Sequence, residues 1–288
     1  MAMIDSTTSS ATSIVLLGES QVGKSHYGAQ LLGRLNSGNC LLRMRGAATN
    51  LSAFEEVAHK LNQGVSAAHT PAVTYNESSW PVEDAGGRPV DLMWPDYGGE
   101  QIRRLIDERR IPPLWRERLR SAQGWMLMLR LHQVSFEDDP FSRPLAELRT
   151  TPAQDAGPVK HSSQARIVEL LQMLLYIRGV GTVTPITEPP LMVMLSFWDE
   201  LSDVGKQTPP QILEKSLPLV ASFISSNWHP ERFQIVGVSP LGRALSVSDP
   251  DESYVNEGPE QHGYVVLPDG VKSSDLTLPI VNLIAMAD

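Results

Sequence analysis

Short apolar runs alternate along this chain with longer segments in which apolar residues recur every three or four positions. The apolar runs predict buried strands at residues 14–17, 124–131, 191–195 and 233–238. The helical spacing predicts one helix directly after residue 25 and three more at residues 50–61, 164–178 and 211–225. Strands and helices that alternate in this order are typical of a doubly wound α/β sheet whose strands are mostly parallel.

Two neighbouring strand-like runs, residues 74–82 and 89–94, break the parallel pattern. Gly86 and Gly87 lie between them, and paired glycines between two such runs indicate a hairpin. We therefore expect one antiparallel hairpin strand, and so a mixed sheet.

The domain organisation is predicted from length and from the distribution of proline and glycine. The 288 residues fit one large domain. We expect a disordered polar lead at residues 1–12 and a single domain at residues 13–288. The domain has expected insertions at about residues 45–66 and at the proline-containing segment 133–163. A small hairpin near residues 263–271 and a helix from about Asp275 form an expected C-terminal extension.

Residues 18–25 carry the pattern Gly18-x-x-x-x-Gly23-Lys24-Ser25, which is typical of a phosphate-binding P-loop. Glycines let backbone amides approach phosphate oxygens, the Lys24 ammonium reaches the β- and γ-phosphates, and the Ser25 hydroxyl is a ligand for Mg²⁺. A glycine turn that binds nothing is the alternative, and the buried strand before the loop and the amphipathic helix after it favour the P-loop. The predicted phosphate-binding residues are Gly18, Glu19, Ser20, Gln21, Val22, Gly23, Lys24, Ser25 and His26.

An acidic residue, Asp96, follows the second hairpin strand and begins the pattern Asp96-x-x-Gly99. A carboxylate at the end of that strand is expected to hold the Mg²⁺ shell opposite Ser25. The Gly99 amide is expected to contact a γ-phosphate and to release it on hydrolysis, which is how a switch loop works.

Composition restricts the partners and the location. The net charge of −9 argues against general affinity for nucleic acid or anionic membranes. The lone cysteine, Cys40, excludes an internal disulfide and suits a reducing cytosol. The start of the chain has no signal-peptide pattern, and the apolar stretch at residues 276–287 is too short to span a bilayer. We expect a cytoplasmic protein.

A segment rich in arginine follows the predicted switch loop. It spans residues 102–121 and is divided by Pro112 and Pro113 into two predicted helices. One interpretation is a solvated face whose charges pair internally. The other is functional: a surface that contacts a protein partner and moves with the switch, or an arginine that stabilises transition-state charge. Its arginines are Arg103, Arg104, Arg109, Arg110, Arg116, Arg118 and Arg120.

The order of these motifs resembles the P-loop GTPases of the translation-factor and Ras-like class. In that class an Asn/Thr-Lys-x-Asp motif reads guanine, and the corresponding residues here are Ser196-Phe197-Trp198-Asp199. The resemblance implies that Asp199 accepts hydrogen bonds from guanine, whereas Phe197 replaces the lysine stem as a stacking surface. Asp199 as a helix N-cap is the alternative. Ser239 and Pro240 fall where the class has a second base-contacting loop.

The same resemblance implies roles for residues near the γ-phosphate. Thr74 corresponds to the switch threonine that joins the Mg²⁺ shell, with Thr70 as the second candidate. Glu100 occupies the position of a water-orienting glutamine, and Gln101 follows it, so intrinsic hydrolysis is expected to be slow or to depend on a partner. The implied catalytic residues are Lys24, Thr74, Glu100 and Gln101, and the implied metal ligands are Ser25, Thr74 and Asp96.

More narrowly, the segments WPDYGGEQ, SFWDEL and GYVVLPDG resemble the bacterial double-GTPase group that is associated with conflict or defence systems. Membership implies GTP or GDP and Mg²⁺ as cofactors and a protein partner such as a second GTPase-like subunit. The leading hypothesis is a GTP-hydrolysing molecular switch. The other two are a GTPase-like scaffold that holds nucleotide with little turnover and a P-loop enzyme that uses ATP.

Overall fold

The computed structural model describes residues 12–67, 77–94, 99–133, 162–180, 183–201 and 206–287. Residues 1–11 of the expected lead and residues 134–161 of the expected second insertion lie outside this set. Thr12, which we expected in the lead, is the first residue of strand β1.

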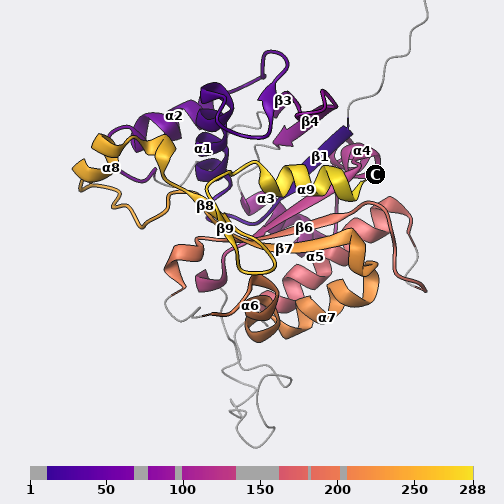
Figure 1. The fold of residues 1–288 in the computed structure, drawn as a ribbon. Coiled ribbons are helices and arrows are strands. Elements are labelled where there is room, and N and C mark those ends of the chain that lie inside the picture. The colour runs from indigo at the N-terminus through magenta and orange to yellow at the C-terminus, as the bar shows by residue number, and fades with distance from the viewer. Residues whose placement is uncertain are drawn as a thin grey trace, which may run out of the picture.

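Within the described residues, the strands form one nine-stranded sheet in the order β2-β3-β4-β1-β5-β6-β7-β8-β9 (Figure 1). The central pairs β1–β4, β1–β5, β5–β6 and β6–β7 are parallel, whereas both ends of the sheet continue through antiparallel pairs. The bounds are β1 Thr12–Leu17, β2 Arg43–Met44, β3 Ser78–Glu83, β4 Pro89–Trp94, β5 Gly124–Leu129, β6 Leu191–Ser196, β7 Phe233–Ser239, β8 Tyr264–Val266 and β9 Lys272–Ser273.

Helices cover both faces of this sheet (Figure 1). Helices α1, α2 and α9 contribute buried side chains to one core, and helices α3 to α7 contribute to the other. The bounds are α1 Lys24–Ser37, α2 Ser52–Leu61, α3 Gly99–Glu108, α4 Pro113–Ser121, α5 Ser163–Arg178, α6 Pro209–Ser216, α7 Pro218–Asn227, α8 Glu252–Glu257 and α9 Leu278–Met286. None of the described helices is both long enough and apolar enough to cross a membrane.

The central strands are buried on both sides, which explains why they read as unbroken apolar runs. Along β5, Trp125, Leu127 and Leu129 face the core under α5, and the alternating residues Met126 and Met128 face the core under α1. This alternation follows from the two-residue period of a strand. The predicted mixed α/β sheet is therefore confirmed, including the antiparallel pairing of β3 with β4.

Three details differ from the expectations. The helix expected at residues 211–225 is two helices, α6 and α7, because Pro218 lacks the amide that a continuous helix needs and displaces Leu217 to φ −136° and ψ 61°. The C-terminal hairpin is part of the main sheet, since β8 pairs with β7. Helix α2 belongs to the core, because Phe54 packs edge-on against Trp80 and Trp94 at centroid distances of 4.9 and 5.4 Å.

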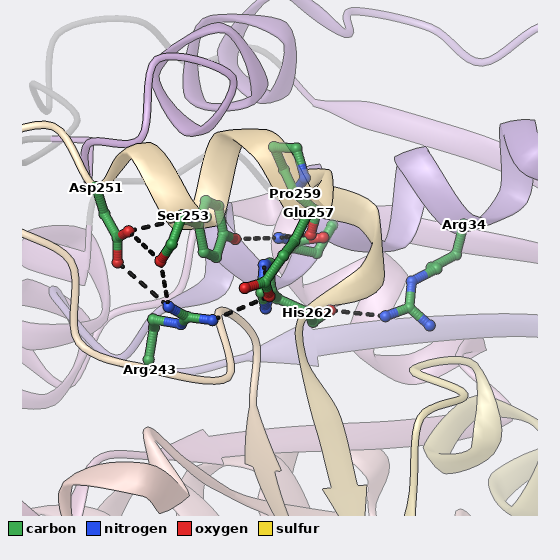
Figure 2. Close-up of polar contacts among 9 residues, drawn as sticks. Arg34, Arg243, Asp251, Ser253, Glu257, Pro259 and His262 are labelled. Atoms are coloured by element: carbon green, nitrogen blue, oxygen red, sulfur yellow. Dashed lines mark hydrogen bonds and ion pairs between the residues drawn. The ribbon is translucent and has the colours of Figure 1, made fainter.

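A polar network fixes the segment between β7 and β8 against α1 (Figure 2). The Arg243 guanidinium binds Asp251, Ser253 and Glu257 around helix α8, with donor–acceptor distances of 2.9 to 3.4 Å. From α1, Gln30 donates to the Tyr254 hydroxyl at 2.7 Å and to the Pro259 carbonyl at 3.0 Å. Arg34 donates to the carbonyl of His262 at 2.6 Å. The loop that follows Ser239 is thus held between β7 and the helix that begins at the P-loop.

Candidate nucleotide-binding site

The predicted ligand residues lie where parallel strands of the sheet end. Strand β1 leads into Gly18, β6 leads into Phe197 and Asp199, and β7 ends at Ser239. Parallel strands that pair side by side place their carboxyl ends at one edge, and this is where α/β sheets bind ligands. The structure therefore brings the phosphate motif and the base motif to the same edge.

Close packing explains both glycines of the P-loop. A Cβ at Gly18 would lie 2.8 Å from the Met128 carbonyl oxygen. Gly23 has φ +90°, and a Cβ there would lie 2.7 Å from the Phe197 ring. Side chains at these positions would push the loop away from the sheet and from the base segment.

Lys24 spans the P-loop. Its Nζ donates to the carbonyl oxygens of Gly18 at 2.7 Å and of Glu19 at 2.6 Å. The amide of Tyr27 donates to the Gly23 carbonyl at 2.9 Å, so Gly23 is the N-cap of α1 and Ser25 lies in the first turn of that helix. The positive end of the α1 dipole and the Lys24 ammonium are at the same place, as an anion site requires.

Several predicted site residues lie outside the part of the chain that the structure describes. Thr70, Thr74 and Asp96 lie outside the described residues, so the expected metal ligands Ser25, Thr74 and Asp96 are represented only by Ser25. Gly99 is the first residue of α3, and the side chains of Glu100 and Gln101 are outside the described part of that helix. Among the described residues, no three His, Cys, Asp or Glu side chains group as a metal site.

Asp199 accepts a hydrogen bond from the Ser239 hydroxyl, and the Gly242 amide donates to the same hydroxyl at 3.0 Å. The structure therefore joins two of the predicted base-contacting residues. Asp199 lies inside a 3-10 turn, Trp198–Glu200, whose N-cap is Phe197, so the interpretation of Asp199 as an N-cap is wrong. Pro240, also predicted here, is buried.

Phe197 adopts a left-handed backbone conformation, with φ 51° and ψ 47°. Residues other than glycine rarely do so, and such strain is concentrated at functional sites. Its ring lies directly over Gly23, which brings the base motif against the P-loop.

Sequence reasoning missed Arg130, which follows β5 at the same edge. Its Nε donates to Glu200 at 3.0 Å, another nitrogen also pairs with Glu200, and a third donates to the Gln21 carbonyl at 3.3 Å. The guanidinium carbon is 4.0 Å from the centroid of the Phe197 ring. The sequence predicted a strand through residue 131, but β5 ends at Leu129, so the one charged residue of that apolar run, Arg130, lies just beyond the strand.

His26 is partly buried beside this group. Its Nε2 shares a hydrogen bond of 3.1 Å with the Ser66 hydroxyl, and its ring is 6.3 Å from that of Phe197. Desolvation, followed by the positive charge of Arg130, lowers the pKa of His26 to about 4. The imidazole is therefore neutral at pH 7.

A second residue that sequence reasoning missed links the P-loop to α3. From α5, Arg166 reaches the Glu19 carboxylate at 3.4 Å and the Asp107 carboxylate at 3.0 Å. The Arg166 side chain is only 15% exposed. The helix that follows the predicted switch loop is thereby connected to the phosphate loop.

The described arginines of the arginine-rich segment fall into two groups, those in ion pairs and those exposed to solvent. Arg118 pairs with Glu77, and Arg109 pairs with Glu169 of α5 at 2.7 Å. Arg110, Arg116 and Arg120 are exposed, and the side chains of Arg103 and Arg104 are not described. Both glutamates lie outside residues 102–121, so these two arginines pair with other parts of the chain, whereas Arg110, Arg116 and Arg120 face solvent.

Comparison with known proteins shows which family this chain matches. The family model described as Double-GTPase 1 matches residues 15–283. No protein of curated function matches the sequence. The small GTPase Arl6 BBS3 of Trypanosoma brucei, solved with GppNp, is 14% identical over 88% of this chain and 99% of that chain, with a TM-score of 0.39.

The Ski7 GTPase-like domain of S. cerevisiae, solved with GTP, is 15% identical over 84% of this chain and 46% of that chain, with a TM-score of 0.43. This chain thus spans less than half of the Ski7 chain. The family match covers nearly the whole sequence. It includes every motif at the carboxyl edge of the sheet. The chain therefore belongs to the Double-GTPase 1 family and carries a GTP-binding domain of the P-loop GTPase type.

Proposed function

We propose that this protein is a Mg²⁺-dependent GTPase that acts as a molecular switch on a partner protein in a bacterial conflict or regulatory system. The observation that carries the proposal is the pairing of Asp199 with Ser239 at the edge where Lys24 spans the P-loop. This arrangement provides an oriented acceptor for a base and a cation for phosphates on one surface.

At the phosphate end, Lys24 exchanges its bonds to the Gly18 and Glu19 carbonyls for bonds to the β- and γ-phosphates. Hard oxygen donors suit Mg²⁺, and Ser25 in the first turn of α1 supplies one of them. Thr74 (or Thr70) and Asp96 are the further ligands we propose. The ion, when bound, neutralises charge on the β- and γ-oxygens.

At the base end, the Ser239 hydroxyl fixes the orientation of the Asp199 carboxylate. A carboxylate accepts through several lone pairs, so it can also accept from guanine N1–H and from the exocyclic amine. Adenine offers no matching pair of donors and would leave the charge unpaired. Phe197 provides the stacking surface.

The switch consists of the segment before β3 and the segment that leads into α3. The Gly99 amide would sense the γ-phosphate, and Arg166 connects the P-loop to α3, so phosphate loss would alter the position of the arginine-rich surface. The exposed Arg110, Arg116 and Arg120 are the contacts we propose for the partner, for example a second GTPase-like subunit.

Calorimetric titration of GTP, GDP and ATP with Mg²⁺ tests the nucleotide. We expect GTP to bind at least roughly two orders of magnitude more tightly than ATP, because a partly buried carboxylate rejects a base without the matching donors. Asp199→Asn should weaken GTP binding and favour xanthosine triphosphate, whose C2 carbonyl accepts from the new amide. Asp249→Asn, at an exposed carboxylate, is the matched control.

Unchanged GTP affinity in Asp199→Asn, without any gain for the xanthine nucleotide, would refute the guanine assignment. A preference for ATP would support the ATP-using alternative. Phosphate release under multiple turnover then separates a GTPase from a scaffold. The glutamate at position 100, where a water-orienting glutamine is expected, favours slow release without a partner.

A further inference from the structure

The segment that reads the base lacks the lysine expected at position 197, where the chain has phenylalanine. A phenylalanine offers a flat surface and no charge. The structure supplies a cation at this place from another strand, because the Arg130 guanidinium lies 4.0 Å from the centroid of the Phe197 ring. Guanidinium groups at this distance are attracted by the ring face.

Arg130 is also bonded on its other sides. Glu200, at the end of the 3-10 turn that contains Asp199, pairs with two of its nitrogens. Arg130 also donates to the Gln21 carbonyl of the P-loop, at 3.3 Å. The side chains of Arg130 and Glu200 are only 21% and 20% exposed, so this pair is better shielded from water than a surface ion pair.

These contacts make Arg130 a bridge between the two halves of the site. On one side it holds the phosphate loop, and on the other it holds both the stacking ring and the turn that carries Asp199. One edge of the Phe197 ring also packs against Gly23, so the ring contacts the P-loop as well as Arg130.

We propose that Arg130 is the positioning residue that replaces the missing lysine of the guanine-reading motif. It fixes the Phe197 ring as the surface on which the base stacks. It also keeps the base segment at a set distance from the P-loop, so that one purine nucleotide can contact the base segment and the P-loop together. The proposal rests on the proposed function and adds the residue that couples its two ends.

The test is a residue exchange. Arg130→Ala should weaken GTP binding roughly 10- to 100-fold, because the ring and the loop lose their common anchor. Phe197→Lys in the Arg130→Ala background returns the lysine to its motif position and should restore GTP affinity to within about threefold. Phe197→Lys alone should bind more weakly than this double variant, because its ammonium faces the Arg130 cation.

Arg109→Ala is the matched control, since it removes an arginine–glutamate pair whose arginine side chain is 77% exposed and whose glutamate lies on α5 rather than in the P-loop or the base segment. It should leave GTP affinity unchanged. Thermal unfolding of each variant checks that it is folded. GTP affinity of Arg130→Ala equal to that of the wild type overturns the proposal, and so does a weakened Arg130→Ala that Phe197→Lys does not restore.

Failure of the proposed function looks different, because the wild type would then not prefer GTP. The bridge remains measurable in that case by hydrogen exchange without nucleotide. Residues 18–23 and the turn Trp198–Glu200 should exchange faster in Arg130→Ala than in the wild type and in Arg109→Ala. Equal exchange in all three proteins overturns the bridge itself.

Discussion

At the scale of single residues, Lys24 holds two carbonyl oxygens of its own loop at 2.6 and 2.7 Å. An ammonium that is already positioned over the loop needs little rearrangement to bind phosphate. Lys24→Ala should therefore lower GTP affinity roughly 10- to 150-fold, the equivalent of about 1.5–3 kcal/mol for a charge-assisted bond. Calorimetry checks this, with Lys60→Ala at an exposed position of α2 as the control. Equal affinities in the two variants contradict the P-loop assignment.

His26 makes a prediction about pH. Its pKa of about 4 in the folded protein is below the ordinary value of 6.5, because burial and Arg130 disfavour the imidazolium. Between these two values the unfolded chain binds a proton that the folded protein does not, so the free energy of unfolding falls as the pH is lowered from 6.5 towards 4. Urea unfolding at pH 7 and pH 5 should show a smaller loss in His26→Gln than in the wild type.

The exposed His59 of α2 supplies the control for this measurement. His59→Gln should lose as much stability as the wild type between pH 7 and pH 5. A His26→Gln variant with the same pH dependence as the wild type shows that His26 does not resist protonation in the folded state.

At the scale of elements, Arg166 of α5 pairs with Asp107 of α3, and Arg109, the residue directly after α3, pairs with Glu169 of α5. Of these two arginines, Arg166 also reaches the P-loop. Arg166 contacts Asp107 and Glu19, and its side chain is 15% exposed, whereas Arg109, which contacts Glu169, is 77% exposed. Exposed pairs contribute little, so Arg166 is the link that should transmit the nucleotide state. We expect α3 to exchange hydrogen more slowly with a non-hydrolysable GTP analogue than with GDP.

Arg166→Gln should reduce this difference in α3, and Arg109→Gln should leave it unchanged. Hydrogen exchange measured on both variants in both nucleotide states decides the point. If the two variants behave alike, the P-loop contact of Arg166 has no part in the switch.

At the scale of the whole molecule, stability depends on two cores on opposite faces of one sheet. Helix α9 closes the core that also contains α1, and Leu283 is fully buried there against Gly124 of β5. Leu283→Ala should lower the free energy of unfolding by about 2–5 kcal/mol, because it leaves a cavity between helix and sheet. Val271→Ala, at a side chain that is 55% exposed, should change it by less than about 0.5 kcal/mol. Urea unfolding measures both; similar values would show that α9 does not support the core.

Most elements of this fold were predictable, since their signals are local. Apolar runs marked β1, β5, β6 and β7, because strands that are buried on both faces read as unbroken apolar segments. The single helix expected at residues 211–225 was wrong although Pro218 was visible, because the apolar period continues across the break. Strand β8 was seen as part of a hairpin, but its pairing with β7 depends on long-range contacts.

The sequence by itself determined the phosphate half of the site and the family resemblance, because a P-loop is one continuous segment whose glycines, lysine and serine serve neighbouring backbone groups. Only the tertiary structure decided which distant residues complete it. Arg130 is 109 positions from Gln21, and Ser239 is 40 positions from Asp199. The order of strands in the sheet sets which strand ends meet, and that order is decided by packing across the whole sheet. For this reason no local pattern identified the arginine that stands in for the missing lysine.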